Sequence, residues 1–89
     1  EHDRIAKFVE DGGVMLRCTL AEHEHVRISI HDVAGRTLRT LDAGLLAPGV
    51  HELDWDGRDE SGAPVAPGVY MARLAGDGAV SVTRMVVLR

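Results

Sequence analysis

Apolar and polar residues alternate in short runs along most of this chain, and clusters of glycine, proline and aspartate separate the runs at intervals of roughly ten residues. In residues 14–20, four apolar side chains alternate with three others, and residues 26–31 repeat the pattern. Successive side chains of a strand point to opposite faces, so each run has one apolar face and one mostly polar face. This period of two predicts strands of a sandwich or barrel, and no segment has the period of a helix.

Six segments are predicted to be strands, and the N-terminal residues are predicted to be either a linker or a weaker first strand. The strands are expected at residues 14–20, 26–31, 36–41, 50–55, 69–74 and 80–88, with 4–10 as the weaker one. Residues 43–49 and 56–68 are predicted loops, and the second is rich in glycine, proline and acidic residues and is expected to be exposed. The count favours an all-β, antiparallel immunoglobulin-like sandwich of about seven strands, with a five- or six-stranded barrel as the alternative.

Large apolar residues at inward strand positions are the predicted core. They are Leu16, Cys18, Leu20, Val26, Ile28, Ile30, Leu38, Leu53, Trp55, Tyr70, Leu74, Val86 and Leu88. The run from Met85 to Leu88 is so apolar that both of its faces are expected to be covered. His51 is expected to face inward and to bond to a backbone group.

Turns are predicted where an aspartate can bond nearby amides and a glycine can take a positive φ. The residues concerned are Asp32, Gly35, Asp56, Gly57, Gly62 and Gly68.

The chain has 89 residues, which is room for one domain with one core. A formal net charge of -4 and the lack of a basic stripe argue against a nucleic-acid partner. The single cysteine cannot form an internal disulfide, and no apolar run approaches the length of a membrane span. Because the chain opens on Glu1 without a signal-like segment, we expect a piece of a larger protein.

Four groups of residues raise the question of chemistry. The acidic residues Asp54, Asp56, Asp59 and Glu60 are weak calcium candidates, because their spacing does not fit a calcium loop, and turn formation is favoured. His23, His25 and His31 invite a zinc site, but solvated histidines on a polar face are favoured. Cys18 is expected to be a buried, inert thiol, and Ser29, Ser61 and Ser81 have no glycine-flanked elbow. We therefore expect no catalytic residues, no metal and no cofactor.

Aromatic and basic residues leave two further alternatives open. Trp55 and Tyr70 are expected to anchor the core, with a sugar-stacking platform as the alternative. Four arginines fall at outward positions, where they either blunt sheet edges or meet an acidic partner; they are Arg17, Arg27, Arg73 and Arg84.

From about Val26 onward, the chain resembles the immunoglobulin-like domain of the flagellar hook-capping protein FlgD and its relatives at the C-termini of bacterial exported proteins. The matching segments are residues 26–32, 35–38, 49–51, 55–59, 62, 68–70 and 84–88, and their order and spacing carry the resemblance. It implies a β-sandwich appended to another protein, often as the last domain, with an extracellular or cell-surface location. In some lineages a related tail directs secretion through the type IX system.

Three functions follow as hypotheses. The leading one is a non-catalytic structural or protein-interaction module at the C-terminus of an exported bacterial protein, whose partners are other domains of that protein or a protein at the cell surface. The second is a secretion or sorting signal, and the third is a calcium- or carbohydrate-binding accessory module.

Overall fold

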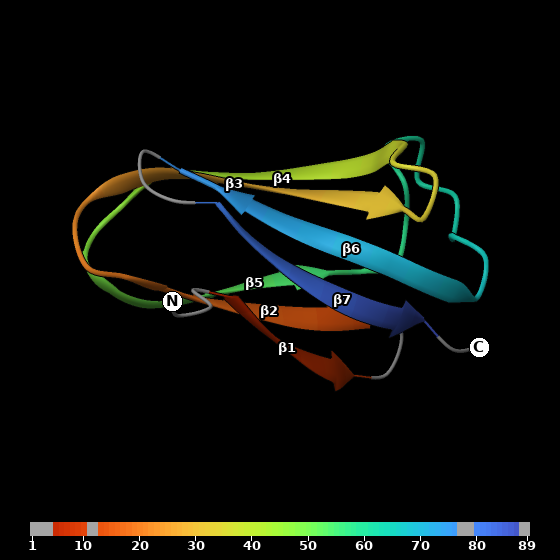
Figure 1. The fold of residues 1–89 in the computed structure, drawn as a ribbon, viewed down its shortest axis with the longest axis horizontal. Helices are drawn as coiled ribbons and strands as arrows, with labels where there is room; N and C mark the ends of the chain where they lie inside the picture. Colours follow the sequence, from red (N-terminus) through yellow and green to blue (C-terminus); the bar gives the residue numbers. More distant parts are fainter. Residues whose placement is uncertain (1–4, 11–12, 77–79, 88–89) are drawn as a thin grey trace.

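Two antiparallel sheets packed face to face make up the computed structural model, which describes residues 5–10, 13–76 and 80–87 (Figure 1). The strands are β1 (Ile5–Glu10), β2 (Gly13–Leu20), β3 (Glu24–Asp32), β4 (Thr37–Leu46), β5 (Gly49–Trp55), β6 (Gly68–Ala75) and β7 (Ser81–Val87). One sheet has the order β1-β2-β5 and the other the order β4-β3-β6-β7. The predicted all-β sandwich is confirmed, and the described residues contain no helix that could cross a membrane.

Strand β4 lies in the four-stranded sheet, beside β3. In a constant-type immunoglobulin domain the fourth strand belongs instead to the sheet of the first, second and fifth strands. Here the β3–β4 connection is a tight hairpin, so β4 stays in the sheet of β3, and the chain changes sheets between β4 and β5. This order places β6 between β3 and β7, and it determines which side chains meet on the outer face of the larger sheet.

The hairpin between β3 and β4 depends on Asp32 and Gly35, as the sequence predicts. Asp32 Oδ1 accepts hydrogen bonds from the backbone N–H groups of Ala34 at 3.0 Å and Arg36 at 2.9 Å. Gly35 has a φ of 88°, which is costly for any residue with a Cβ. The Asp32 side chain therefore replaces backbone partners that the turn leaves open.

The core lies between the inner faces of the two sheets. Nine of the predicted core residues are buried there: Leu16, Cys18, Leu20, Val26, Ile28, Ile30, Trp55, Tyr70 and Leu74. Leu38 and Leu53 are half-buried and pack against this cluster. The buried cluster also includes residues outside the predicted set, namely Ile5, Val14, Val65, Ala72 and Met85.

The prediction that Val86 lies in the core is wrong. Met85 pairs with the buried Tyr70 and has no exposed surface, whereas Val86 pairs with Val69 on the outer face and is 39% exposed. Since opposite residues of an antiparallel pair share a face, the register of β7 on β6 decides which of the two neighbours is buried. The expectation that both faces of β7 are covered is therefore also wrong, because the outer face is exposed at Val86. Leu88 lies outside the described residues.

Two predicted loops also differ from the structure. Residues 43–46 continue β4, because residues 44–46 pair with residues 24–26 at the start of β3, beyond a register shift between Val26 and Arg27. Gly44 takes a φ of 73° there. The 56–68 segment is not wholly exposed, since Val65 is only 8% exposed and its N–H donates to the carbonyl of Gly57 at 2.9 Å. An apolar side chain in a polar loop thus closes one end of the core.

The N-terminal residues that the structure describes form a strand and not a linker. β1 pairs with β2 along its whole length, beginning with Ile5 opposite Cys18, and Ile5 is buried. Residues 5–10 are therefore an integral part of the smaller sheet.

Candidate functional site

Asp59 organises the tip of the loop between β5 and β6. Its Oδ1 accepts hydrogen bonds from the N–H and the hydroxyl of Ser61, at 3.0 and 2.6 Å, and from the N–H of Ala63 at 3.1 Å. The bond from the Ser61 hydroxyl, followed by that from the Ala63 amide, holds the pKa of Asp59 below its usual value of 3.8. Gly62 in the same turn has a φ of 88°. The carboxylate is thus used to form a turn, which is the role that the sequence favours.

Arg39 of β4 ties this loop to the larger sheet. Its guanidinium Nη1 lies 3.2 Å from Asp56 Oδ1 and donates to the carbonyl of Arg58, while its Nε lies 3.3 Å from Glu60 Oε1. The N–H of Glu60 in turn donates to the carbonyl of Leu38 at 2.9 Å, on the outer edge of β4. A cation at Asp56 and Glu60 would have to displace an arginine that already neutralises both carboxylates.

The four acidic calcium candidates do not assemble into one site. Asp56 Oδ1 also accepts from the N–H of Arg58 at 3.0 Å, which makes it a turn residue as well as a partner of Arg39. Asp54 lies on β5, opposite Met15 of the smaller sheet. Within residues 5–10, 13–76 and 80–87, no three histidine, cysteine, aspartate or glutamate side chains lie close enough together to hold a metal ion.

Trp55 and Tyr70 are buried together and cannot form a sugar-stacking platform. Their ring centroids are 6.0 Å apart in an edge-to-face arrangement, and Trp55 is only 1% exposed. The indole N–H donates to the carbonyl of Arg58 at 2.9 Å, and the Tyr70 hydroxyl donates to the carbonyl of Ala66. Each polar tip is therefore satisfied by the 56–67 loop, and the two rings fasten this loop to the core.

Ser29 and His31, which alternation places on one polar face of β3, are in contact in the structure. His31 Nε2 lies 2.9 Å from Ser29 Oγ, and His31 Nδ1 lies 3.1 Å from Thr37 Oγ1. A nucleophilic serine also needs backbone or side-chain donors for the oxyanion. Ser29 lies in the middle of β3, a strand paired on both sides, so the neighbouring backbone amides belong to the sheet. The Ser29–His31–Thr37 chain can order this face of the sheet but has no site for acyl transfer.

Of the other histidines that the structure describes, His51 serves local structure and His23 lies in solvent. His51 Nε2 bonds to the carbonyl of Ala47 at 2.6 Å, which matches the expected backbone partner, and His23 is exposed in the connection between β2 and β3. Cys18 is buried and forms no disulfide. No zinc-ligating set forms around these residues in the described part of the chain.

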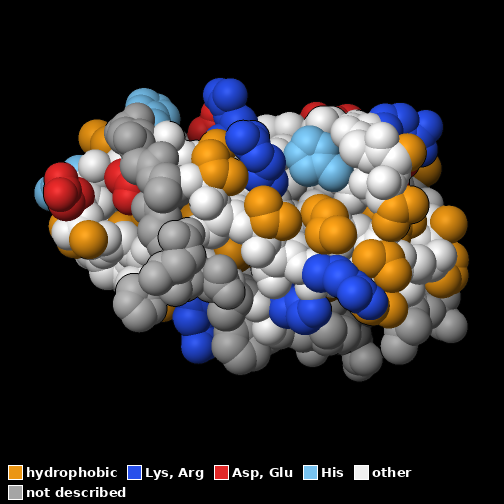
Figure 2. Space-filling view, viewed as in Figure 1, with side chains coloured by type: hydrophobic (Ala, Val, Ile, Leu, Met, Phe, Trp, Pro, Cys, Tyr) orange, Lys and Arg blue, Asp and Glu red, His pale blue; other side chains and the backbone are white. Residues whose placement is uncertain are grey.

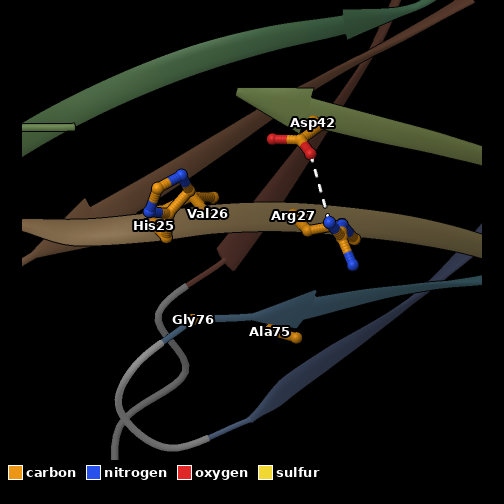
Figure 3. A pocket seen from close by; sticks show the side chains of 6 residues that line it. All are labelled: His25, Val26, Arg27, Asp42, Ala75 and Gly76. Carbon is orange, nitrogen blue, oxygen red and sulfur yellow. Dashed lines mark hydrogen bonds and ion pairs between the residues drawn. The ribbon is translucent and has the colours of Figure 1, made fainter. Parts of the chain in front are cut away.

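A shallow pocket lies between β3, β4 and the end of β6 (Figure 3). Its polar groups are His25 and the ion pair of Arg27 with Asp42, whose closest atoms are 3.2 Å apart. Asp42 Oδ1 also accepts from the N–H of Gly44, and this bond, followed by the one from Arg27, lowers the pKa of Asp42. Figure 3 shows the His25 ring apart from this pair. Because both carboxylate oxygens already have donors, a cation at Asp42 would compete with Arg27 and with the N–H of Gly44.

One exposed surface of the larger sheet is the outer β6–β7 face. We use this name for Val69, Met71, Arg73, Val82, Arg84 and Val86. Hydrophobic side chains lie beside basic ones on the face that Figure 2 draws, and most acidic side chains in this view lie at its left end and upper edge. Val82 is 50% exposed. A hollow of about 440 Å³ adjoins this face and is lined by residues that include His31, Val33 and Met71.

Comparison with known proteins gives one family. The model of the FlgD Ig-like domain matches residues 3–79. Basal-body rod modification proteins FlgD from Salmonella typhimurium strain LT2 and from Salmonella typhi are each 43% identical over 47 residues. Those matches cover 53% of this chain and 20% of each relative, so the chain spans about a fifth of their length.

A solved structure agrees with the fold. The crystal structure of FlgD from P. aeruginosa superposes with a TM-score of 0.66 at 22% identity, over 94% of this chain and 66% of that one. The resemblance drawn from the sequence is confirmed, and the chain belongs to the FlgD Ig-like domain family.

Proposed function

We propose that this chain is a non-catalytic structural and protein-interaction module of an exported bacterial protein. One observation carries the proposal: the polar groups that the fold gathers bond to one another, while the outer β6–β7 face stays uncovered. Asp59 holds a turn, Arg39 neutralises Asp56, and His31 bonds to two hydroxyl groups. Such an arrangement favours recognition by a stable surface over bond chemistry.

Family membership supports the same proposal. The FlgD relatives are named as basal-body rod modification proteins, and modification of a protein rod requires contact with other protein subunits. We extend to this chain only the contact with protein partners. We place the chain at the C-terminus of its parent protein and the contact at or beyond the cell surface. A rod as the partner is named for those relatives alone.

The experiment is to replace the 89 residues in the parent protein by an unrelated sandwich of similar size in the native host. The expected result is normal export of the parent with loss of its assembly or retention at the cell surface. Loss of export would favour the secretion-signal alternative, because an export machine would then be reading the domain. A parent that exports and assembles normally without this domain would refute the proposal.

A further inference from the structure

Pairing between β6 and β7 arranges the outer β6–β7 face as alternating apolar and cationic side chains. Met71 lies opposite Arg84, Arg73 lies opposite Val82, and Val69 lies opposite Val86. Residues directly opposite in an antiparallel pair have Cβ atoms about 5 Å apart, so each arginine has an apolar neighbour across the pair. The face therefore offers apolar contact area and guanidinium donors in one continuous strip.

Charge on this strip is opposite to that of the chain as a whole. The formal net charge of the chain is -4, yet Gly68–Ala75 and Ser81–Val87 contain no aspartate or glutamate. Four other arginines, Arg17, Arg27, Arg36 and Arg39, each form an ion pair with a carboxylate. Within the described part of the chain, the guanidinium groups of Arg73 and Arg84 have no such partner.

The backbone edge of β7, unlike its outer face, carries a contact from another strand. Lys7 of β1 donates from its ammonium group to the backbone carbonyl of Arg84, so a lysine occupies this acceptor on the open side of β7. Lysine at a sheet edge opposes the addition of another strand. A partner is therefore directed to the side chains of β6 and β7 and away from the backbone edge at this position.

We propose that the outer β6–β7 face binds an acidic segment of a partner protein that also carries apolar side chains, a proposal that rests on the module function above. Carboxylates of the partner pair with Arg73 and Arg84, because a guanidinium binds a carboxylate through two parallel hydrogen bonds. Apolar side chains of the partner cover Val82, Val86 and Met71. An ion pair at the surface contributes little alone, so the adjoining apolar contacts and the hollow beside His31 supply the rest of the affinity.

Nuclear magnetic resonance titration of the full chain tests this inference. The probe is a short synthetic peptide in which glutamate and valine alternate, and the control peptide has lysine in place of each glutamate. We expect the glutamate peptide to shift amide signals of β6, β7 and the end of β3, with little effect on β1, β2 and β5. The affinity is expected to fall by a factor of about ten or more in the Arg73→Glu, Arg84→Glu double variant.

Arg17→Glu is the control for charge, and it is matched to each single variant, Arg73→Glu or Arg84→Glu. Arg17 lies on the outer face of the smaller sheet, 2.9 Å from Glu52, so this variant changes the charge in the same direction at a distant place. We expect it to retain the affinity of the parent chain within a factor of about two. Val82→Ser tests the apolar part and is expected to weaken binding without changing any charge.

Several results would overturn the inference. One is that the glutamate peptide fails to bind, and another is that Arg17→Glu weakens its binding as much as the substitutions at Arg73 and Arg84 do. A third is that the shifted amide signals are centred on β1, β2 and β5. A fourth is that the lysine peptide or single-stranded DNA binds as tightly as the glutamate peptide or more tightly. Thermal melting of each variant verifies that it is folded before its affinity is read. Loss of assembly in the domain-replacement experiment, together with no peptide binding, would reject this face and leave the module function standing.

Discussion

Replacing Trp55 with alanine is the most informative test of the fold. The ring is 1% exposed, meets Tyr70 edge to face, and donates its N–H to the carbonyl of Arg58. It is the single tryptophan of the chain, at the point where the core meets the 56–67 loop. Its removal would leave a cavity and release the loop from the core at the same time.

The magnitude can be worked out from these contacts. A buried aromatic side chain removes about 150–250 Å² from water, which at about 25 cal/mol per Å² gives roughly 4–6 kcal/mol. Alanine keeps part of this burial, and truncations of large rings in cores cost about 3–5 kcal/mol. The lost hydrogen bond adds little, because the carbonyl of Arg58 still accepts from Arg39 at 3.2 Å. We expect Trp55→Ala to lower the free energy of unfolding by about 4 kcal/mol, a large part of the stability of a typical small domain.

Urea denaturation followed by far-ultraviolet circular dichroism measures this loss, since the variant has no tryptophan whose fluorescence could be followed. Val50→Ala on the same strand is the matched control, because Val50 is 59% exposed and its truncation should change stability by less than about 0.5 kcal/mol. Trp55→Phe keeps most of the apolar contact and is expected to lose clearly less than alanine does. A loss below about 1 kcal/mol for Trp55→Ala would refute the reasoning and place the ring outside the core.

Three further predictions concern the turns and the thiol. Asp59 has a lower pKa in the folded chain than the unfolded value of 3.8, so its stabilising effect is complete above that value and is lost as the pH falls through the folded pKa. Below about pH 4, the melting temperature should therefore decline more steeply for the parent chain than for Asp59→Asn. Identical slopes would contradict this. Gly35→Ala forces a Cβ into a φ of 88° and should lower the free energy of unfolding by about 1 kcal/mol in urea melts, whereas no loss would show that the turn relaxes. Cys18 has no exposed surface, so a thiol reagent should modify it only at the rate of unfolding, and rapid modification of the folded chain would contradict its burial.

Period-two alternation predicted most of the fold because a sandwich requires it on every strand whose two faces differ. It worked where apolar and polar residues alternate strictly, as in residues 26–31, and failed where they do not. In Ser81–Val87 the neighbours Met85 and Val86 are both apolar, so only the register on β6 determines which one is buried. The end of β4 was missed for a similar reason, since pairing with β3 and not local composition extends it to Leu46.

Local and distant contacts also differed in how far the sequence predicted them. The turns at Asp32 and Asp59 depend on amides two to four residues away. Residue order alone predicts Asp32 as a turn residue and predicts a turn at Gly62, close to Asp59. Arg39 gave no such signal, because its partners Asp56 and Glu60 lie far along the chain and approach it only after β4 and β5 have entered different sheets. Val65 was missed because its surroundings in the sequence are polar and rich in glycine and proline.

The composition of the outer β6–β7 face depends on the strand order as well as on the alternation of residues in each strand. Alternation alone predicts that Arg73 and Arg84 point outward, but it does not say whether they share a sheet or which residues lie between them. The order β4-β3-β6-β7 makes β6 and β7 neighbours and puts Met71 opposite Arg84 and Val82 opposite Arg73. Asp42 lies on β4, two strands away from β7, and pairs with Arg27, while Asp32 at the end of β3 pairs with Arg36, so neither carboxylate neutralises Arg84. A cationic, apolar strip on an acidic chain is thus a consequence of this topology.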